Sequence, residues 1–291
     1  MLTVLAPAKL NLTLEVLAER PDGYHEIRNV FQTINLCDSL RFQLSRKVTI
    51  MSDSPDWAPE KSLVAKAVSL LQETAGCVEG ATIEVSKGIP LVSGLGGDSS
   101  DAAATLCGLN KLWKLELSVE KLLELATRLG SDVAFFLYGG TAFVAGRGEM
   151  ITPLPPLPHR WVILVLPDVP KLPEKTKQLY ASLNTSHYTD GQITQRLVDQ
   201  LRESREPSIL FNTFENVAFS RFSKLKVHRD HMVKMGASNV HLAGSGPTLF
   251  TLLKDKVQAV NLYTRCQHQN METYLVETLN ESQLPHRIHI S

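Results

Sequence analysis

Residues 94–100 read Gly-Leu-Gly-Gly-Asp-Ser-Ser and stand directly before an alanine-rich run with helical spacing. Glycines let a backbone turn its N–H groups inward, and a following helix adds unpaired N–H groups and the positive end of its dipole. The hydroxyls of Ser99 and Ser100 could donate to phosphate oxygens or ligate Mg²⁺. The segment therefore predicts a triphosphate-binding loop. The alternative is an ordinary strand–helix connection capped by Ser99 or Asp98.

This loop differs from two common glycine-rich nucleotide motifs. No Gly-Lys-Ser/Thr sequence follows it, as a Walker A loop requires, and Gly94-x-Gly96 lacks the third glycine of a dinucleotide fingerprint. Asp98 and Asp101 would repel a phosphate unless Mg²⁺ lay between them, because this cation accepts carboxylate and phosphate oxygens together. Helix capping is the other interpretation of either aspartate.

Two charged residues stand in apolar surroundings. Lys9 interrupts the strand-like APAKLNLTL, either as an edge residue that reaches solvent or as a fixed cation for a phosphoryl group. Asn11 shares its face by the period-two rule. Asp132 precedes the apolar VAFFLY and either complements a helix dipole or takes a proton from a substrate hydroxyl.

Two further segments could face a ligand. Tyr24 and His25 follow a Pro-Asp-Gly turn and form either a surface aromatic pair or part of a binding site. The turn Gly244-Ser245-Gly246 lies between apolar runs and would by itself be an ordinary β-turn. Together with residues 94–100, however, it could close over a single ligand.

Composition narrows the class of protein. The 291 residues are 43% hydrophobic and 21% charged, with a formal net charge of +0, so no broad basic field predicts a nucleic-acid or membrane partner. The N-terminus lacks the pattern of a signal peptide, and no run approaches the roughly 18 apolar residues of a membrane span. The four cysteines are far apart, which favours reduced thiols over disulfides or a zinc site. These features predict a cytoplasmic enzyme.

Periodicity predicts an α+β protein of two lobes. In the first half we expect strands over 10–17, 30–36, 40–45, 47–51 and 81–86, helices over 63–75, 99–113 and 118–129 and from 131, and a hairpin over 139–154. In the second half we expect strands over 161–167 and 273–279, two strands around the turn at 243–248, and helices near 174–183, 189–203, 214–235 and 255–268. The proline-rich PLPPLPH at 153–159 predicts a crossover between domains at 1–154 and 155–291.

The segments PAKLNLTL, PDGYHEI, IPLVSGLGGDSSDAAATL, LGSDVAFFL and AGSGPTLF occur in this order between residues 5 and 250. In sequence and spacing the chain resembles the GHMP kinase superfamily. The resemblance implies a two-lobed α+β kinase that uses ATP and Mg²⁺, with its active site in the cleft between the lobes. The pair PAKLNL and DGYH resembles the members whose alcohol substrate carries a cytidine diphosphate group.

The resemblance also implies roles for individual residues. It makes Asp132 the catalytic base and Lys9 its cationic partner, with Tyr24 and His25 at the cytosine, Phe31 as a second aromatic wall and 244–246 near the diphosphate. The ATP phosphates would lie against Pro90, Gly94, Leu95, Gly96, Gly97, Asp98, Ser99 and Ser100. The substrate side would comprise Asn11, Tyr24, His25, Phe31, Thr176, Gly244, Ser245 and Gly246. No metal-ligating residue is assigned.

The chain departs from the pattern of the superfamily at three places. Asp98 replaces a common glycine, Leu242-Ala243 stands where Met followed by Ser or Thr is frequent, and Ser62 lies near an asparagine commonly used for adenine. Two other functions stay open: another small-alcohol kinase, such as homoserine or mevalonate kinase, or a nucleotide-binding regulator without activity. A monomer or a homodimer is expected.

Overall fold

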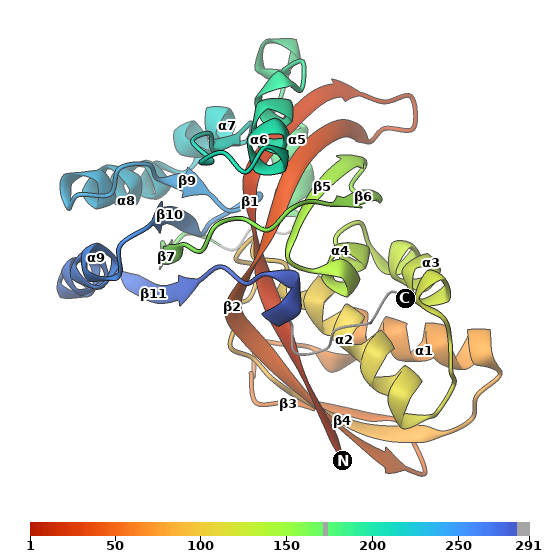
Figure 1. Cartoon of the computed structure of the whole chain (residues 1–291). Helices are drawn as coiled ribbons and strands as arrows, with labels where there is room; N and C mark the ends of the chain where they lie inside the picture. The colour runs from red at the N-terminus through yellow and green to blue at the C-terminus, as the bar shows by residue number, and fades with distance from the viewer. Residues whose placement is uncertain (171–173, 284–291) are drawn as a thin grey trace.

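A computed structural model of the chain describes residues 1–170 and 174–283. Two β-sheets with helices packed against them form an α+β architecture, as the sequence predicts (Figure 1). Within these residues, none of the helices combines the length and the apolar character needed to cross a membrane.

The first sheet is built on a long antiparallel hairpin of β1 (Leu2–Glu19) and β2 (His25–Ser45). Both strands run well beyond the predicted segments, because the hairpin also pairs through polar positions that break the apolar pattern. The strand order is β3-β4-β2-β1-β8, and β5 joins β2 to β6. The shorter strands are β3 (Thr49–Ser52), β4 (Gly80–Ser86), β5 (Thr141–Gly146), β6 (Met150–Pro153) and β8 (Phe211–Asn212).

Four helices of the first half share one core with the first sheet. They are α1 (Leu63–Ala75), α2 (Gly97–Leu112), α3 (Val119–Leu129) and α4 (Val133–Tyr138). The predicted bounds of α1 are confirmed: the Ser62 hydroxyl caps its first turn, and Gly76 ends it in a left-handed conformation. Ser118 caps α3 in the same way.

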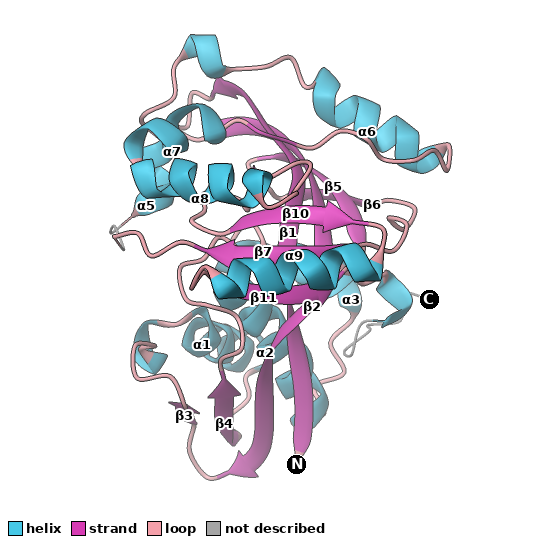
Figure 2. Cartoon of the chain, turned by 90° about the vertical axis from the view of Figure 1, so that its left-hand side faces the viewer, coloured by secondary structure: helices cyan, strands magenta, loops and turns pink. Residues whose placement is uncertain are grey.

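The second sheet is antiparallel, with the order β11-β7-β10-β9. Its strands are β7 (Trp161–Leu166), β9 (His241–Leu242), β10 (Leu249–Leu253) and β11 (Glu272–Glu277), and they run across the long hairpin in Figure 2. The helices of this half are α5 (Lys175–Tyr180), α6 (Gln192–Arg202), α7 (Glu215–Arg221), α8 (Ser223–Lys234) and α9 (Lys256–His268). Short 3₁₀ turns cover Pro59–Lys61, Thr185–His187 and Glu281–Gln283.

One expected helix is wrong in detail. Residues 214–235 form α7 and α8 instead of a single helix, because Phe222 adopts φ −119° and ψ 88°, outside the helical region. The ring of Phe222 packs against the core of the second half, which the local pattern does not reveal.

Strand β1 connects the two halves. Val4 packs in the core with α1–α4, Leu10 packs against the second sheet, and Val16 packs with residues of α5 and α7. Because residues 6–16 are buried on both faces, a polar side chain in the middle of β1 must find partners inside the protein. The division at 154/155 stays a prediction.

Candidate active site

The two residues expected to form a catalytic pair lie together. Lys9 Nζ lies 3.6 Å from Asp132 Oδ2 and donates to Asn11 Oδ1 at 2.7 Å. The Lys9 side chain is 5% exposed, whereas that of Asp132 is 32% exposed. Asp132 occupies the N-cap of α4, because the helix begins at Val133 rather than at the predicted residue 131. A fixed cation from β1 thus contacts a carboxylate that stays open to a ligand.

The environment of Lys9 is apolar as well as charged. Burial lowers the pKa of Lys9, and the neighbouring negative charge of Asp132 opposes this decrease. The ammonium lies 4.6 Å from the centroid of the Phe31 ring, and that ring packs edge-on against Phe135. Phe31 is only 2% exposed. Its ring forms the buried floor under Lys9, and its expected role as an aromatic wall for a base stays a prediction.

The loop at 94–96 leads directly into α2, which begins at Gly97 rather than at Ser99. The N-cap residue is Gly96, and no side chain caps the first turn. The first N–H groups of a helix lack partners within it, so those of α2 are open to an anion. Ser99 is half-buried and Asp98 exposed at this end of α2. Pro90 lies before the loop and is half-buried.

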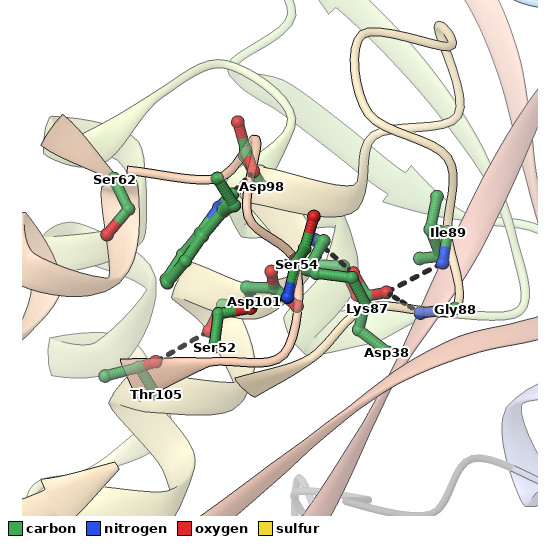
Figure 3. A network of polar contacts seen from close by, with 12 residues as sticks. Asp38, Ser52, Ser54, Ser62, Lys87, Gly88, Ile89, Asp98, Asp101 and Thr105 are labelled. Carbon is green, nitrogen blue, oxygen red and sulfur yellow. Dashed lines mark hydrogen bonds and ion pairs between the residues drawn. The ribbon is translucent and has the colours of Figure 1, made fainter. Parts of the chain in front are cut away.

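Three residues of the loop and of α2 have partners within the fold. The Ser100 hydroxyl is buried and donates to the main-chain oxygen of Pro7 at 2.7 Å, so it is committed within the fold. Leu95 places its side chain in the core, and its carbonyl oxygen accepts from Lys9 N at 2.9 Å. Asp101 is buried and pairs with Lys87, so it cannot hold Mg²⁺ jointly with Asp98 (Figure 3). Among residues 1–170 and 174–283, no group of three or more His, Cys, Asp or Glu residues is arranged to bind a metal.

The second glycine turn meets the first at Lys9. Gly94 has φ +86°, and a Cβ there would lie 2.2 Å from the carbonyl oxygen of Ala243. Gly244 has φ +55°, and a Cβ there would lie 3.4 Å from Lys9 Nζ and 3.3 Å from Asn11 Oδ1. Both positions require glycine for conformation as well as for space. The two loops and the middle of β1 therefore form one site.

Helix α5 contributes a lysine that the sequence did not indicate. Lys175 Nζ donates to the main-chain oxygens of Val92 and Gly246, and so joins the two loops. Lys175 is 8% exposed, and within the described part of the chain no carboxylate lies at ion-pair distance from it. Burial lowers its pKa to about 8. Its neighbours Glu174 and Lys177 are charged and exposed, so the local sequence is typical of a solvated helix.

Next to Lys175, Thr176 lies where the resemblance expects a substrate contact. Its Oγ1 is 2.8 Å from Ser245 Oγ, so the helix and the second loop also meet through side chains. Both residues belong to the predicted substrate side.

An aromatic group surrounds His25. The His25 ring stacks on Tyr180 with centroids 4.6 Å apart, and Tyr188 approaches it edge-on at 6.1 Å. Burial lowers the pKa of His25. Burial and, to a smaller extent, the charge of Asp132 raise the pKa of Tyr180. Tyr180 and Tyr188 were not predicted, because they follow His25 by more than 150 residues.

Tyr24 lies at the exposed turn between β1 and β2 and is 56% exposed. The guanidinium of Arg147, from the β5–β6 turn, lies 4.7 Å from its ring centroid. One face of Tyr24 thus already has a cationic neighbour. Arg147 was also missed from the sequence.

The segment before α1 closes the other side of the first loop. Trp57 Nε1 donates to Asp98 Oδ1 at 3.3 Å, which joins this segment to the start of α2. The Ser62 hydroxyl accepts from Ala65 N and donates to Pro59 O. Its hydrogen-bonding groups are therefore committed to the cap of α1.

Comparison with known proteins decides the family. Residues 62–140 match the model of the GHMP kinases N terminal domain. The chain is 49% identical over 280 residues to a 4-diphosphocytidyl-2-C-methyl-D-erythritol kinase of Dehalococcoides mccartyi, covering 96% of this chain and 99% of that protein. The chain belongs to this kinase family.

Two solved structures place the fold in the same context. A crystal structure of 4-(cytidine 5'-diphospho)-2C-methyl-D-erythritol kinase is 32% identical and covers 95% of this chain and 99% of its own, with a TM-score of 0.82. A homoserine kinase from Cytophaga hutchinsonii is 20% identical, covering 96% of this chain and 95% of its own, with a TM-score of 0.66. The second likeness concerns the fold alone. The superfamily and the kinase subgroup expected from the motifs are both confirmed.

Replacing Gly94 by alanine tests the meeting of the two loops. We expect Gly94→Ala to reduce kcat/KM by about 100-fold, since a shift of roughly 1 Å in a site can have such an effect. Gly76→Ala is the matched control: its φ is +59°, but nothing lies within 4 Å of the added Cβ. Steady-state kinetics of both variants give the answer, and equal activity would contradict the tight approach.

The buried Lys175 predicts a specific dependence of stability on pH. The unfolded chain keeps this lysine protonated up to its ordinary pKa of 10.5, whereas the folded protein releases the proton at about 8. Between these pH values the unfolded state binds more protons, so the free energy of unfolding rises with pH.

Lys175→Met should remove this rise, so that the wild-type protein gains stability relative to the variant from pH of about 8 to 10.5. Urea unfolding across this range measures the difference, with Lys177→Met, at an exposed neighbour on α5, as control. A difference that is flat with pH would show that Lys175 is not desolvated.

Proposed function

We propose that this chain transfers the γ-phosphoryl group of ATP to the 2-hydroxyl of 4-diphosphocytidyl-2-C-methyl-D-erythritol, giving the 2-phosphate and ADP. This reaction belongs to the methylerythritol phosphate route to isoprenoid precursors. The observation that carries the proposal is the Lys9–Asp132 pair at 3.6 Å, beside the meeting point of two glycine loops. The named relatives at 49% and 32% identity support the choice of alcohol.

In this reaction Asp132 accepts the proton of the attacking hydroxyl. Its carboxylate is partly exposed, while Lys9 is held by Asn11 on the buried side. Phosphoryl transfer has a loose transition state, so catalysis asks mainly for positioning and for compensation of charge. Lys9 serves both needs, because its ammonium orients Asp132 and lies where the negative charge of the transferring group develops.

ATP lies with its phosphates against the N-terminus of α2. The uncapped N–H groups after Gly96 bind phosphate oxygens. The Ser99 hydroxyl donates to them as well, whereas the Ser100 hydroxyl is already bonded to the main-chain oxygen of Pro7. Mg²⁺, when bound, would offset the charge of the phosphates, and the exposed Asp98 carboxylate at this end of α2 could contribute a ligand. No cage of protein ligands is needed for this, since Mg²⁺ commonly keeps several waters.

The substrate lies between α5 and the β1–β2 turn. His25 and Tyr24 contact the cytosine, and Ser245 and Thr176 lie where its diphosphate passes toward Lys9. The N–H groups of the second glycine loop add donors for these phosphates. The cytoplasmic location, the monomeric or homodimeric state and the division into two domains stay predictions.

A panel of alcohols tests the proposed substrate. With ATP present, the release of ADP is followed for 4-diphosphocytidyl-2-C-methyl-D-erythritol, homoserine and mevalonate. We expect kcat/KM for the first to exceed the others by about 10,000-fold, because a site built to bind polar groups rejects ligands that lack them. Comparable turnover of homoserine or mevalonate would indicate another small-alcohol kinase, and ATP binding without any turnover would indicate a regulator.

Substitution of the catalytic pair tests the roles of its members. Asp132→Asn should bind both substrates yet lose about 100- to 10,000-fold in kcat, because the amide cannot accept the proton. Lys9→Ala should also decrease kcat strongly, with a smaller change in KM. Asp168→Asn, at an acid with a fully exposed side chain, is the control. Full turnover of Asp132→Asn would rule out Asp132 as the base.

A further inference from the structure

Beneath residues 94–100, here called the phosphate loop after their proposed role, lies a buried group of three charged residues, Asp38, Lys87 and Asp101, here called the acid–lysine cluster (Figure 3). Asp38 comes from β2, Lys87 from the segment after β4, and Asp101 from the second turn of α2. Lys87 Nζ donates to Asp38 Oδ2 and, at 2.8 Å, to Asp101 Oδ2. The side chains of the two acids are 0% exposed and that of Lys87 is 5% exposed.

The formal charges of the cluster do not balance. Two carboxylates and one ammonium would leave a buried negative charge, and an uncompensated buried charge is costly. Among residues 1–170 and 174–283, Lys87 is the only cation that forms an ion pair with either acid. Asp53 and Asp98 are exposed acids, and burial together with the charge of Asp38 raises the pKa of the Cys37 thiol to about 11.

The hydrogen bonds distinguish the two acids. Asp38 Oδ1 accepts from the N–H groups of Gly88 and Ile89, both at 2.7 Å, and its other oxygen accepts from Lys87. These charge-assisted bonds stabilise an ionised carboxylate. Asp101 Oδ1, in contrast, is buried and has no hydrogen-bond partner in the described part of the chain. Ionisation of Asp101 would leave negative charge on an oxygen without a donor.

We propose that Asp101 carries a proton at neutral pH, and that the resulting neutral cluster positions the phosphate loop without opposing the charge of ATP. Burial and the neighbouring charge of Asp38 raise the pKa of Asp101, which agrees with this assignment. Asp38 and Asp101 are thus positioning residues, not catalytic ones. The inference rests on the proposed binding of ATP at this loop.

The position of the cluster explains why its charge matters. A Cβ on Gly97, the first residue of α2, would lie 3.4 Å from Asp38 Oδ2. The carboxyl groups therefore lie directly behind the N–H groups that receive the phosphates. A second ionised carboxylate there would weaken the positive potential of the helix start, whereas a protonated one leaves it intact.

The sign of the pH dependence follows from the raised pKa of Asp101. The unfolded chain releases this proton near the ordinary pKa of 3.8, while the folded protein retains it to higher pH. In that interval the folded state binds more protons, so ionisation of the unfolded chain decreases stability as the pH rises. Asp101→Asn lacks the proton and should lack this decrease.

Infrared spectroscopy of protein labelled with ¹³C at the aspartate carboxyl groups gives a readout that does not depend on activity. At pH 7 the wild-type protein should show the carbonyl band of a buried neutral carboxyl group, and Asp101→Asn should lose it. Asp53→Asn is the matched control, because its exposed carboxylate accepts from the Lys87 N–H at 3.0 Å. Its spectrum should keep the band.

Kinetics separate the roles of the two acids. Since asparagine resembles a neutral carboxyl group, Asp101→Asn should keep the KM for ATP within about threefold. Asp38→Asn should displace the phosphate loop and so increase the KM for ATP by about tenfold or more. The KM for the alcohol should change less, because the second glycine loop stays in place. A direct structural collapse would instead lower the amount of folded protein and affect both substrates equally.

Absence of the neutral carboxyl band from the wild-type spectrum would overturn the proposal, and this measurement does not depend on whether Asp101→Asn folds. Persistence of the band in Asp101→Asn would overturn it too. Equal damage to ATP binding by both substitutions would overturn it as well. If the band is present as expected but ATP does not bind at this loop, the protonation of Asp101 stands and the proposed function fails.

Discussion

The close approach of two main-chain loops is the constraint on which the site depends. A Cβ on Gly94 would lie 2.2 Å from the carbonyl oxygen of Ala243, and one on Gly244 would lie 3.1 Å from the carbonyl oxygen of Gly94 and 3.4 Å from Lys9 Nζ. This approach has a cost, because left-handed positions favour glycine and glycine loses more conformational entropy on folding than other residues. Here the approach brings both loops to Lys9, which pairs with Asp132 from a distant segment.

Strand β1 makes this arrangement rigid. It runs through the cores of both halves, and Lys9 stands in its middle with apolar neighbours before and after it. Burial of an ammonium is unfavourable by itself, and the interactions with Asn11, Asp132 and the face of Phe31 offset it. Removal of the carboxylate would leave an incompletely compensated cation, so the pair is coupled in structure as well as in the proposed chemistry.

Three buried lysines serve the site in different ways. Lys9 faces a single carboxylate, Lys87 lies between two, and Lys175 contacts only main-chain oxygens within the described part of the chain. Their pKa shifts follow these surroundings: burial dominates for Lys9 and Lys175, whose pKa values decrease, while two acids outweigh it for Lys87, whose pKa increases. The loop thus needs no Walker-type lysine of its own, because neighbouring segments bring positive charge to it.

Local patterns in the sequence determined the α+β class, the limits of α1, the two glycine loops and the family motifs around Lys9 and Asp132. These features depend on periodicity, helix caps and turn residues, which act on backbone groups only a few positions away along the chain. Only the tertiary structure decided that Ser100 binds Pro7, that Phe31 lies under Lys9, that Lys175 joins the loops and that Asp101 shares a lysine with Asp38. Such partners are far apart in sequence, and a side chain's hydrogen bonds and charge are set by what packs against it.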